Sequence, residues 1–372
     1  MKKCSMNSRL DYEAIPDWTH LRERYLAFWR NEVADDCIIA HIQNPNPHRP
    51  EPEPWMLGAS QEKYLNPEMF FALQNWRRTA WNWHADLFKY RIASYGPNIF
   101  AGFVGGQPVF GENTVWHEPV INNLDEADRL HFDEDNHYWQ KHLETVDCYS
   151  KKLAGIEQFG MTDFGGACDW ISTLMPVENF MIAALEDSDR MRDFALRLAR
   201  EANRAYDILY PRITRRNDGI VNWMPVWNDQ RMGTVQDDMA INFSPGLYAE
   251  VFLPALREIA GHTEHTVLHW HDGCSQHLDA LLGVPGIDLI QYGHDPNSPA
   301  FTKKIPKMQR IQASGKKLFI SCVEAHDVET FIRALDPRGL MMIINTASDE
   351  ASRQMQDEVS RWTKERMGDL GI

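Results

Sequence analysis

The sequence predicts an α/β fold, a (β/α)8 TIM barrel with an N-terminal helical extension and long loops. From about residue 125 onward, helical patterns alternate with short apolar strands. Successive strands lie a few tens of residues apart with a helix between them, which is typical of parallel βαβ units. The 372 residues and the apolar content of 43% suit one large barrel. We therefore expect residues 1–372 to form a single domain, with residues 1–35 as the helical extension.

Local patterns justify the elements in order. An apolar stripe that includes Leu21, Tyr25 and Phe28 predicts a helix near the N-terminus. Five prolines within residues 44–54 predict an extended surface loop. The pair Asn66-Pro67 predicts the start of a helix that we extend over 66–92, and 96–120 reads as a crossing loop or a hairpin. Further helices are predicted at 136–156, 177–185, 187–215, 245–262, 275–283, 300–314, 325–335 and 348–366. The eight strands are predicted at 37–41, near residue 100, and at 158–162, 219–225, 266–270, 289–292, 318–322 and 341–345.

Charge and composition exclude some classes of function. The net charge is −15, and the 38 basic residues are scattered, so the basic patch of a nucleic-acid-binding protein is missing. No run approaches the ~18 apolar residues of a membrane helix, and the N-terminus lacks an apolar signal core. We expect a cytoplasmic protein with a small-molecule substrate. The six widely spaced cysteines fit reduced thiols better than a disulfide framework.

The stretch 266–274 is the most informative, because an apolar strand runs into two histidines. His269 and His271 are two residues apart, so on a strand their side chains point to the same face. A second strand ends at Cys322. If both strands belong to one parallel barrel, their ends share a rim, where two imidazoles and a thiolate could hold zinc. We expect a zinc site of His269, His271 and Cys322. The alternatives are that the histidines only form hydrogen bonds to the barrel rim or to a substrate, and that Cys322 is a buried core residue.

Other polar and aromatic residues fall at predicted strand ends. Asp163 and Asp238 are candidate catalytic carboxylates, although a glycine-requiring loop and a helix cap would also explain them. An aromatic wall could hold a methylated cation or a sugar ring, whereas core packing is the plain alternative. The candidate substrate-binding residues are Trp170, Trp223, Trp227, Trp270, Tyr292 and Asn345.

Four segments, 21–39, 236–256, 286–292 and 336–340, in this order and spacing resemble the uroporphyrinogen decarboxylase superfamily, which includes corrinoid-dependent methyltransferases. The resemblance covers nearly the whole chain and implies a TIM barrel, with Asp238 in the aspartate-bearing loop. The decarboxylases grip substrate carboxylates with an arginine-rich motif, and here only Arg49 stands in the corresponding stretch. Asp86 is expected to occupy the place of the decarboxylase's essential aspartate.

The methyltransferase branch implies zinc held by a His-x-Cys pair and a further cysteine near the last strand. Here the pair is His269-Trp270-His271, and the last strand offers no thiol. Cys322 on the preceding strand would replace it, since imidazole and thiolate both suit zinc.

We therefore expect methyl transfer, with a metal as Lewis acid, between a small methylated amine, ether or similar substrate and a corrinoid or thiol. Nothing resembles a cobalamin-binding domain, so the corrinoid would sit on a separate partner protein; a homodimer is also allowed. One alternative is a metal-free carboxy-lyase acting on a small acid through Asp86 or Asp238. Another is a carbohydrate-binding or carbohydrate-processing barrel that uses Asp163, Asp238 or Glu324.

Overall fold

The computed structural model describes residues 15, 17–295 and 299–372 and shows an α/β fold built on a mostly parallel sheet. Seven strands pair in the order β2-β1-β13-β12-β11-β10-β9, four more in the order β3-β6-β7-β8, and β4 and β5 form a hairpin. The strands are β1 (Ile39–Pro45), β2 (Trp81–Ala85), β3 (Tyr90–Ile92), β4 (Gln107–Phe110), β5 (Val115–Glu118), β6 (Gln158–Gly160), β7 (Ile220–Val221), β8 (Trp227–Asn228), β9 (Met232–Gln236), β10 (His265–His271), β11 (Ile287–Gly293), β12 (Lys317–Glu324) and β13 (Leu340–Asn345).

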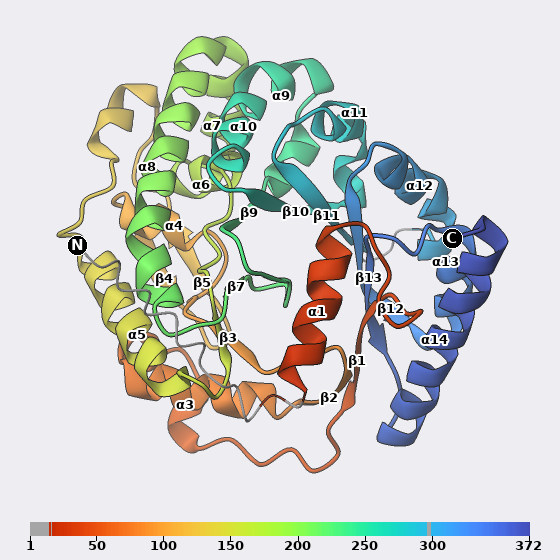
Figure 1. The fold of residues 1–372 in the computed structure, drawn as a ribbon. Helices are drawn as coiled ribbons and strands as arrows, with labels where there is room; N and C mark the ends of the chain where they lie inside the picture. Colours follow the sequence, from red (N-terminus) through yellow and green to blue (C-terminus); the bar gives the residue numbers. More distant parts are fainter. Residues whose placement is uncertain (1–14, 16, 296–298) are drawn as a thin grey trace, which may run out of the picture.

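Helices surround the strands, with α8 and α14 on opposite flanks (Figure 1). The α-helices are α1 (Trp18–Trp29), α2 (Gln61–Leu65), α3 (Pro67–Arg78), α4 (Ile99–Phe103), α5 (His137–Leu153), α6 (Ala167–Leu174), α7 (Val177–Glu186), α8 (Ser188–Thr214), α9 (Pro245–Val251), α10 (Leu253–Ala260), α11 (Leu278–Leu282), α12 (Ile305–Ala313), α13 (Val328–Ala334) and α14 (Asp349–Leu370). The 3₁₀ helices are η1 (Pro54–Met56), η2 (Leu124–Arg129), η3 (Asp238–Asn242), η4 (Asp272–His277), η5 (Phe301–Lys304) and η6 (Ala325–Asp327). Within the described ranges, no helix is long and apolar enough to cross a bilayer.

The expected alternation of strands and helices is confirmed, and the pairs from β9 to β13 and on to β1 are all parallel. Backbone pairing among the described residues does not join the seven-stranded and four-stranded sheets. Closure into an eight-stranded barrel, and a single domain over 1–372, therefore stay predictions. Of the expected N-terminal extension, the structure shows α1, and residues 1–14 and 16 lie outside the described residues.

Two predicted elements are wrong. The helix expected over 66–92 ends at Arg78, and β2 and β3 follow it, because Trp81–Ala85 pairs antiparallel with β1. The strand expected near residue 100 is helix α4. Its five residues are all buried, so they lack the periodicity that would distinguish a helix from a strand. The hairpin alternative for 96–120 is confirmed by β4 and β5.

Helix α1 covers the ends at which the strands begin. The Trp29 ring stacks on His265, the first residue of β10, at 4.7 Å. The Lys317 ammonium, at the first residue of β12, lies 5.5 Å from the same ring. Because parallel strands begin at one edge and end at the other, α1 leaves the carboxyl ends free to carry a site.

Candidate metal centre

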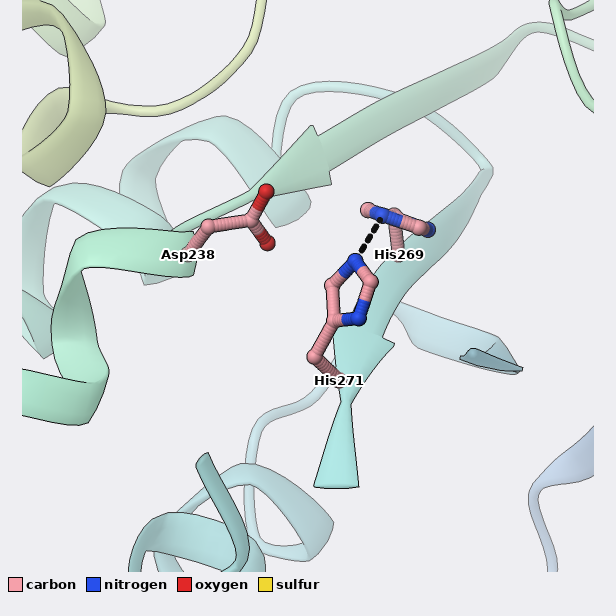
Figure 2. Close-up of side chains that lie close together, drawn as sticks. All are labelled: Asp238, His269 and His271. Atoms are coloured by element: carbon pink, nitrogen blue, oxygen red, sulfur yellow. Dashed lines mark hydrogen bonds between the residues drawn. The ribbon is translucent and has the colours of Figure 1, made fainter. Parts of the chain in front are cut away.

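The carboxyl end of β10 presents two histidines next to an aspartate from the loop after β9. His269 and His271 lie on the same face of the strand, and Asp238 begins helix η3 (Figure 2). One ligand atom of each residue lies within 4.8 Å of the others, and the Asp238 carboxylate points toward the two rings. The His271 side chain is 33% exposed, so the cluster is reached from solvent.

The two imidazoles face each other through their Nε2 atoms, which are 3.0 Å apart. Each Nδ1 faces an acceptor: for His271 the Asp295 Oδ1 at 2.6 Å, and for His269 the Gln291 side-chain oxygen. An Nδ1–H donated to such an acceptor leaves Nε2 with its lone pair in a neutral ring. Two lone pairs this close repel each other unless a proton or a metal ion lies between them.

The groups behind the histidines are themselves held in place. The second oxygen of Asp295 accepts from the Gly273 backbone N–H at 2.8 Å. The Gln291 amide donates to the Ser321 hydroxyl at 2.6 Å, and Gln291 pairs with His269 in the sheet register. Such partners orient metal-ligating histidines and fix their tautomers. Sequence reasoning missed Asp295, Gln291 and Ser321, although strand alternation next to Tyr292 could have indicated Gln291.

Burial keeps His269 neutral. Desolvation lowers its pKa and outweighs the opposing effect of the Asp238 charge. Only a neutral imidazole can act as a metal ligand, so this shift favours metal binding at neutral pH.

Further carboxylates lie beside the cluster. Burial, with smaller contributions from the charges of Asp238 and Asp169, raises the pKa of Asp163 to about 7. Burial likewise raises the pKa of Asp169 to about 7, and that of Asp237 well above its usual range. Asp237 accepts hydrogen bonds from the Tyr248 hydroxyl at 2.8 Å and from the Cys168 backbone N–H at 3.1 Å. The expected catalytic aspartates Asp163 and Asp238 therefore belong to one acidic region.

The structure does not bring Cys322 into the histidine cluster. Its sulfur lies outside the group of mutually close ligand atoms in the described residues. The pairing of β12 with β13 shifts register between Ile320 and Val323, and Cys322 sits in this bulge, exposed and with a φ of 58°. A bulge re-aims side chains at the end of a strand. Asp238 stands where the thiolate was expected.

The expected aromatic wall is reduced to one ring. Trp223 lies 5.1 Å from the His269 ring. Trp170 and Trp227 are fully buried, and their indole N–H groups donate to the carbonyls of Phe164 and Asp218. These two rings are core residues.

Trp270 and Tyr292 also pack away from the cluster. Trp270 stands between His269 and His271, so strand alternation sends it to the opposite face. There it meets Tyr292 at 5.0 Å, and Tyr292 packs on Phe301 at 5.7 Å. Both side chains are buried, which is the packing that the alternative reading expected.

Two further candidates make contacts of their own. Asp86 is held by Arg24 through two bonds of 2.8 Å and by the Ala40 backbone N–H at 2.8 Å. These are the contacts of a structural ion pair that joins α1 to the residue after β2, and they give no support to a catalytic role. Asn345 lies at the end of β13, where Gln43 donates to its amide oxygen at 3.1 Å and its amide donates to Glu324 at 3.3 Å. Its substrate-binding role stays a prediction.

Comparison with known proteins gives a likeness in structure. No protein-family model and no curated protein sequence matches the chain. Among solved structures, the chain is similar to a methyltransferase from Methanosarcina mazei, with a TM-score of 0.56 and 14% sequence identity over 95% of this chain and 99% of that chain. At this identity the likeness establishes a shared fold over nearly the whole of both chains.

Proposed function

We propose that the chain is a methyltransferase whose catalytic centre is a divalent metal ion, zinc in the first instance, held by Asp238, His269 and His271. The observation that carries the proposal is the pair of Nε2 atoms facing each other 3.0 Å apart with the Asp238 carboxylate beside them. Two nitrogen ligands on a tetrahedral zinc ion are ~3.3 Å apart, as two Zn–N bonds of ~2.0 Å require. The fold shared with a methyltransferase supports the reaction class.

The donor set fits a catalytic rather than a structural site. Three protein ligands leave room for a further ligand, and nitrogen and carboxylate donors suit zinc and other first-row metals. A bound ion there supplies Lewis acidity to an oxygen, nitrogen or sulfur atom that bears or receives the methyl group. Thiolate from Cys322 is not needed in this arrangement.

The chain's own residues prepare the centre. Asp295 and Gln291 hold the Nδ1 protons of the two histidines, so both Nε2 lone pairs point to one place. Trp223 borders the centre next to His269, and Asp163 orients the small methylated substrate. The substrate exchanges its methyl group with a corrinoid on a separate protein, or with a thiol. The chain that carries this centre folds as a closed eight-stranded barrel.

Measuring the zinc content of the purified protein tests whether these three residues bind a metal ion. Protein purified without chelator or nickel resin is expected to hold about one zinc per chain, as a three-ligand site does. His271→Ala should lose the metal, whereas His48→Ala, an exposed histidine on the proline-rich loop, should keep it. Metal-free wild-type protein that still transfers methyl groups would contradict the proposal.

A matched pair of variants tests the geometry. The same two strands carry a second histidine–aspartate contact, His265 Nδ1 to Asp288 at 2.9 Å, at their opposite ends. Asp295→Asn should weaken zinc binding about 10–100-fold, the usual effect of losing a carboxylate behind a ligating histidine. Asp288→Asn should leave it unchanged, as measured by competition with a chromophoric chelator. Equal zinc affinity in both variants would refute the arrangement.

A further inference from the structure

A cleft of about 750 Å³ opens where strand pairing is interrupted. Residues 81–85 of β2 line it together with Arg91 of β3. β2 and β3 are end strands of the seven-stranded and the four-stranded sheet, and in the described residues they do not pair with each other. The volume lies within the usual range of small-molecule sites, about 300–1,000 Å³. None of the three residues of the candidate metal centre lines the cleft, so it is a separate place on the molecule.

One carboxylate in the wall of the cleft is shared by two guanidinium groups. Glu157 Oε2 accepts from Arg91 Nε at 2.9 Å and from Arg78 Nη1 at 2.6 Å. Arg91 has two further acceptors, the Asn75 side-chain oxygen and the Phe71 carbonyl, so each of its nitrogens has a partner. Glu157 therefore neutralises the second guanidinium, that of Arg78, only in part.

The Arg78 guanidinium keeps one edge without acceptors. Its Nε is buried and unpartnered, and none of the described residues accepts a hydrogen bond from its Nη2. These two nitrogens form a fork that matches both oxygens of a carboxylate or phosphate. A buried N–H of a charged group is costly without an acceptor, and an anionic ligand would supply one. The side chain lines the cleft and is 21% exposed, so an anion in the cleft can reach the guanidinium.

Aromatic rings flank the same guanidinium. The Trp83 ring lies 4.8 Å from the central carbon of Arg78 and stacks on Tyr90 at 6.1 Å. Trp81 also lines the cleft, and 41% of it is exposed. Indole rings at the wall of a cleft offer flat apolar surface to a flat ligand. The cleft therefore combines an apolar surface with an incompletely paired cation.

The lining carries an excess of positive charge in a chain whose net charge is −15. Lys89 lines the cleft, is exposed and forms no ion pair within the part of the chain that the structure describes. Together with Arg78 and Arg91 it makes three cations, against the carboxylates of Glu157 and Asp349. Asp349 accepts hydrogen bonds from side chains of β2, and its own side chain is 51% exposed. The excess cation near Arg78 favours an anion in this cleft.

We propose that the cleft between β2 and β3 binds a small organic anion with a flat apolar body. Its carboxylate or phosphate group pairs with Arg78, and its ring lies against the indoles of β2. Lys89 adds attraction from the exposed side of the cleft, and Arg91 holds Glu157 in place. The site goes beyond the proposed metal centre and does not depend on it.

Three probes with the same ring test the charge class of the ligand. Benzoate is an anion, benzamide is neutral and benzylammonium is a cation. In isothermal titration calorimetry, wild-type protein should bind benzoate tightest, and acetate, which has no ring, more weakly than benzoate. Tightest binding of benzamide, benzylammonium or acetate would overturn the proposal.

Removal of metal separates the cleft from the metal centre. Benzoate should bind with the same affinity before and after dialysis against a chelator, because no metal takes part in the cleft. Binding that disappears with the metal would overturn the proposal, since that benzoate would occupy the metal centre. Phenyl phosphate distinguishes the two head groups: the tighter of phenyl phosphate and benzoate identifies the group that the fork prefers, and failure of both to bind would refute the site.

Variants of Arg78 locate the binding. Arg78→Gln should weaken benzoate binding about tenfold or more, because it removes a charged hydrogen-bond donor. Arg78→Lys keeps the charge without the fork and should weaken binding less. Arg353→Gln removes the same charge from an exposed position on α14 and should leave the affinity unchanged. Equal affinities in Arg78→Gln and Arg353→Gln would contradict the proposal, and the probe series on wild-type protein decides the charge class if Arg78→Gln fails to fold.

Discussion

Replacement of Asp163 by asparagine is expected to stabilise the metal-free protein, and to do so only above acidic pH. Burial raises the pKa of this carboxyl from 3.8 to about 7, so the folded state holds its proton more tightly than the unfolded state does. The stability that the protonated group contributes is therefore fully present below about pH 4 and is lost as pH rises through about 7. A shift of about three units at about 1.4 kcal/mol each gives an upper limit of about 4 kcal/mol.

Urea unfolding followed by circular dichroism, in the presence of EDTA, measures this effect. The free energies of unfolding of Asp163→Asn and wild type should nearly coincide at about pH 4 and diverge up to pH 8, with the variant more stable. Asp128→Asn, exposed and of equal charge change, should show no such divergence. A difference that is constant with pH, or a variant that is less stable at pH 8, would refute the reasoning that an unpaired carboxylate is buried here.

Three further outcomes are expected. Cys322→Ser should leave zinc affinity in chelator competition unchanged, because the thiol lies outside the ligand cluster; a tenfold loss would restore the thiolate as a ligand. Asp86→Asn should lower the free energy of unfolding in urea by about 3–5 kcal/mol, since it leaves the buried Arg24 charge with only the exposed Asp35 carboxylate at 3.5 Å; a neutral effect would speak against a structural ion pair. Desolvation raises the pKa of Glu157, but ion pairing, led by Arg91, outweighs it and lowers the pKa below 4.5, so Glu157→Gln should cost stability above about pH 4.5. This loss in the free energy of unfolding should vanish as pH falls through the lowered pKa of Glu157. Urea unfolding at several pH values measures it, and a loss that persists at low pH would contradict the expectation.

The sequence predicted the histidine pair because side chains on a strand repeat every two residues. The same rule, applied to Trp270 and Tyr292, would have placed both on the packed face, where the structure has them. The abundance of aromatic residues favoured a binding role for these two rings, whereas the role of Gln291 depends on its register opposite His269.

The partners of the histidines could not be predicted in the same way. Cys322, at the end of a predicted strand, was the expected third ligand, whereas Asp238 was expected as a catalytic carboxylate after a strand, β9, that was not predicted. Only three-dimensional geometry shows which of the two lies beside the histidines. The bulge that turns Cys322 away depends on the pairing of β12 with β13, which leaves no mark in the sequence of either strand. Asp295 lies in a loop, where side chains do not alternate regularly between two faces as they do on a strand.

Fold prediction succeeded where long amphipathic helices alternate with apolar strands and failed where segments are short. The error at α4 came from a buried run of five apolar residues. The error after Arg78 came from β2, whose strand conformation depends on pairing with β1. In both places tertiary contacts outweigh local preference.

One histidine–aspartate pair lies at each end of β10, His265 with Asp288 and His271 with Asp295. A seven-residue strand is about 20 Å long, so the two pairs are too far apart to sense each other directly. In a nuclear magnetic resonance spectrum of protein with labelled histidines, the imidazole resonances of His265 and His271 would therefore report independently on the two ends of the strand. The His265 signal would report whether the sheet is folded, and the His271 signal whether the metal is bound. A single titration with a chelator would then separate loss of metal from loss of structure in one sample.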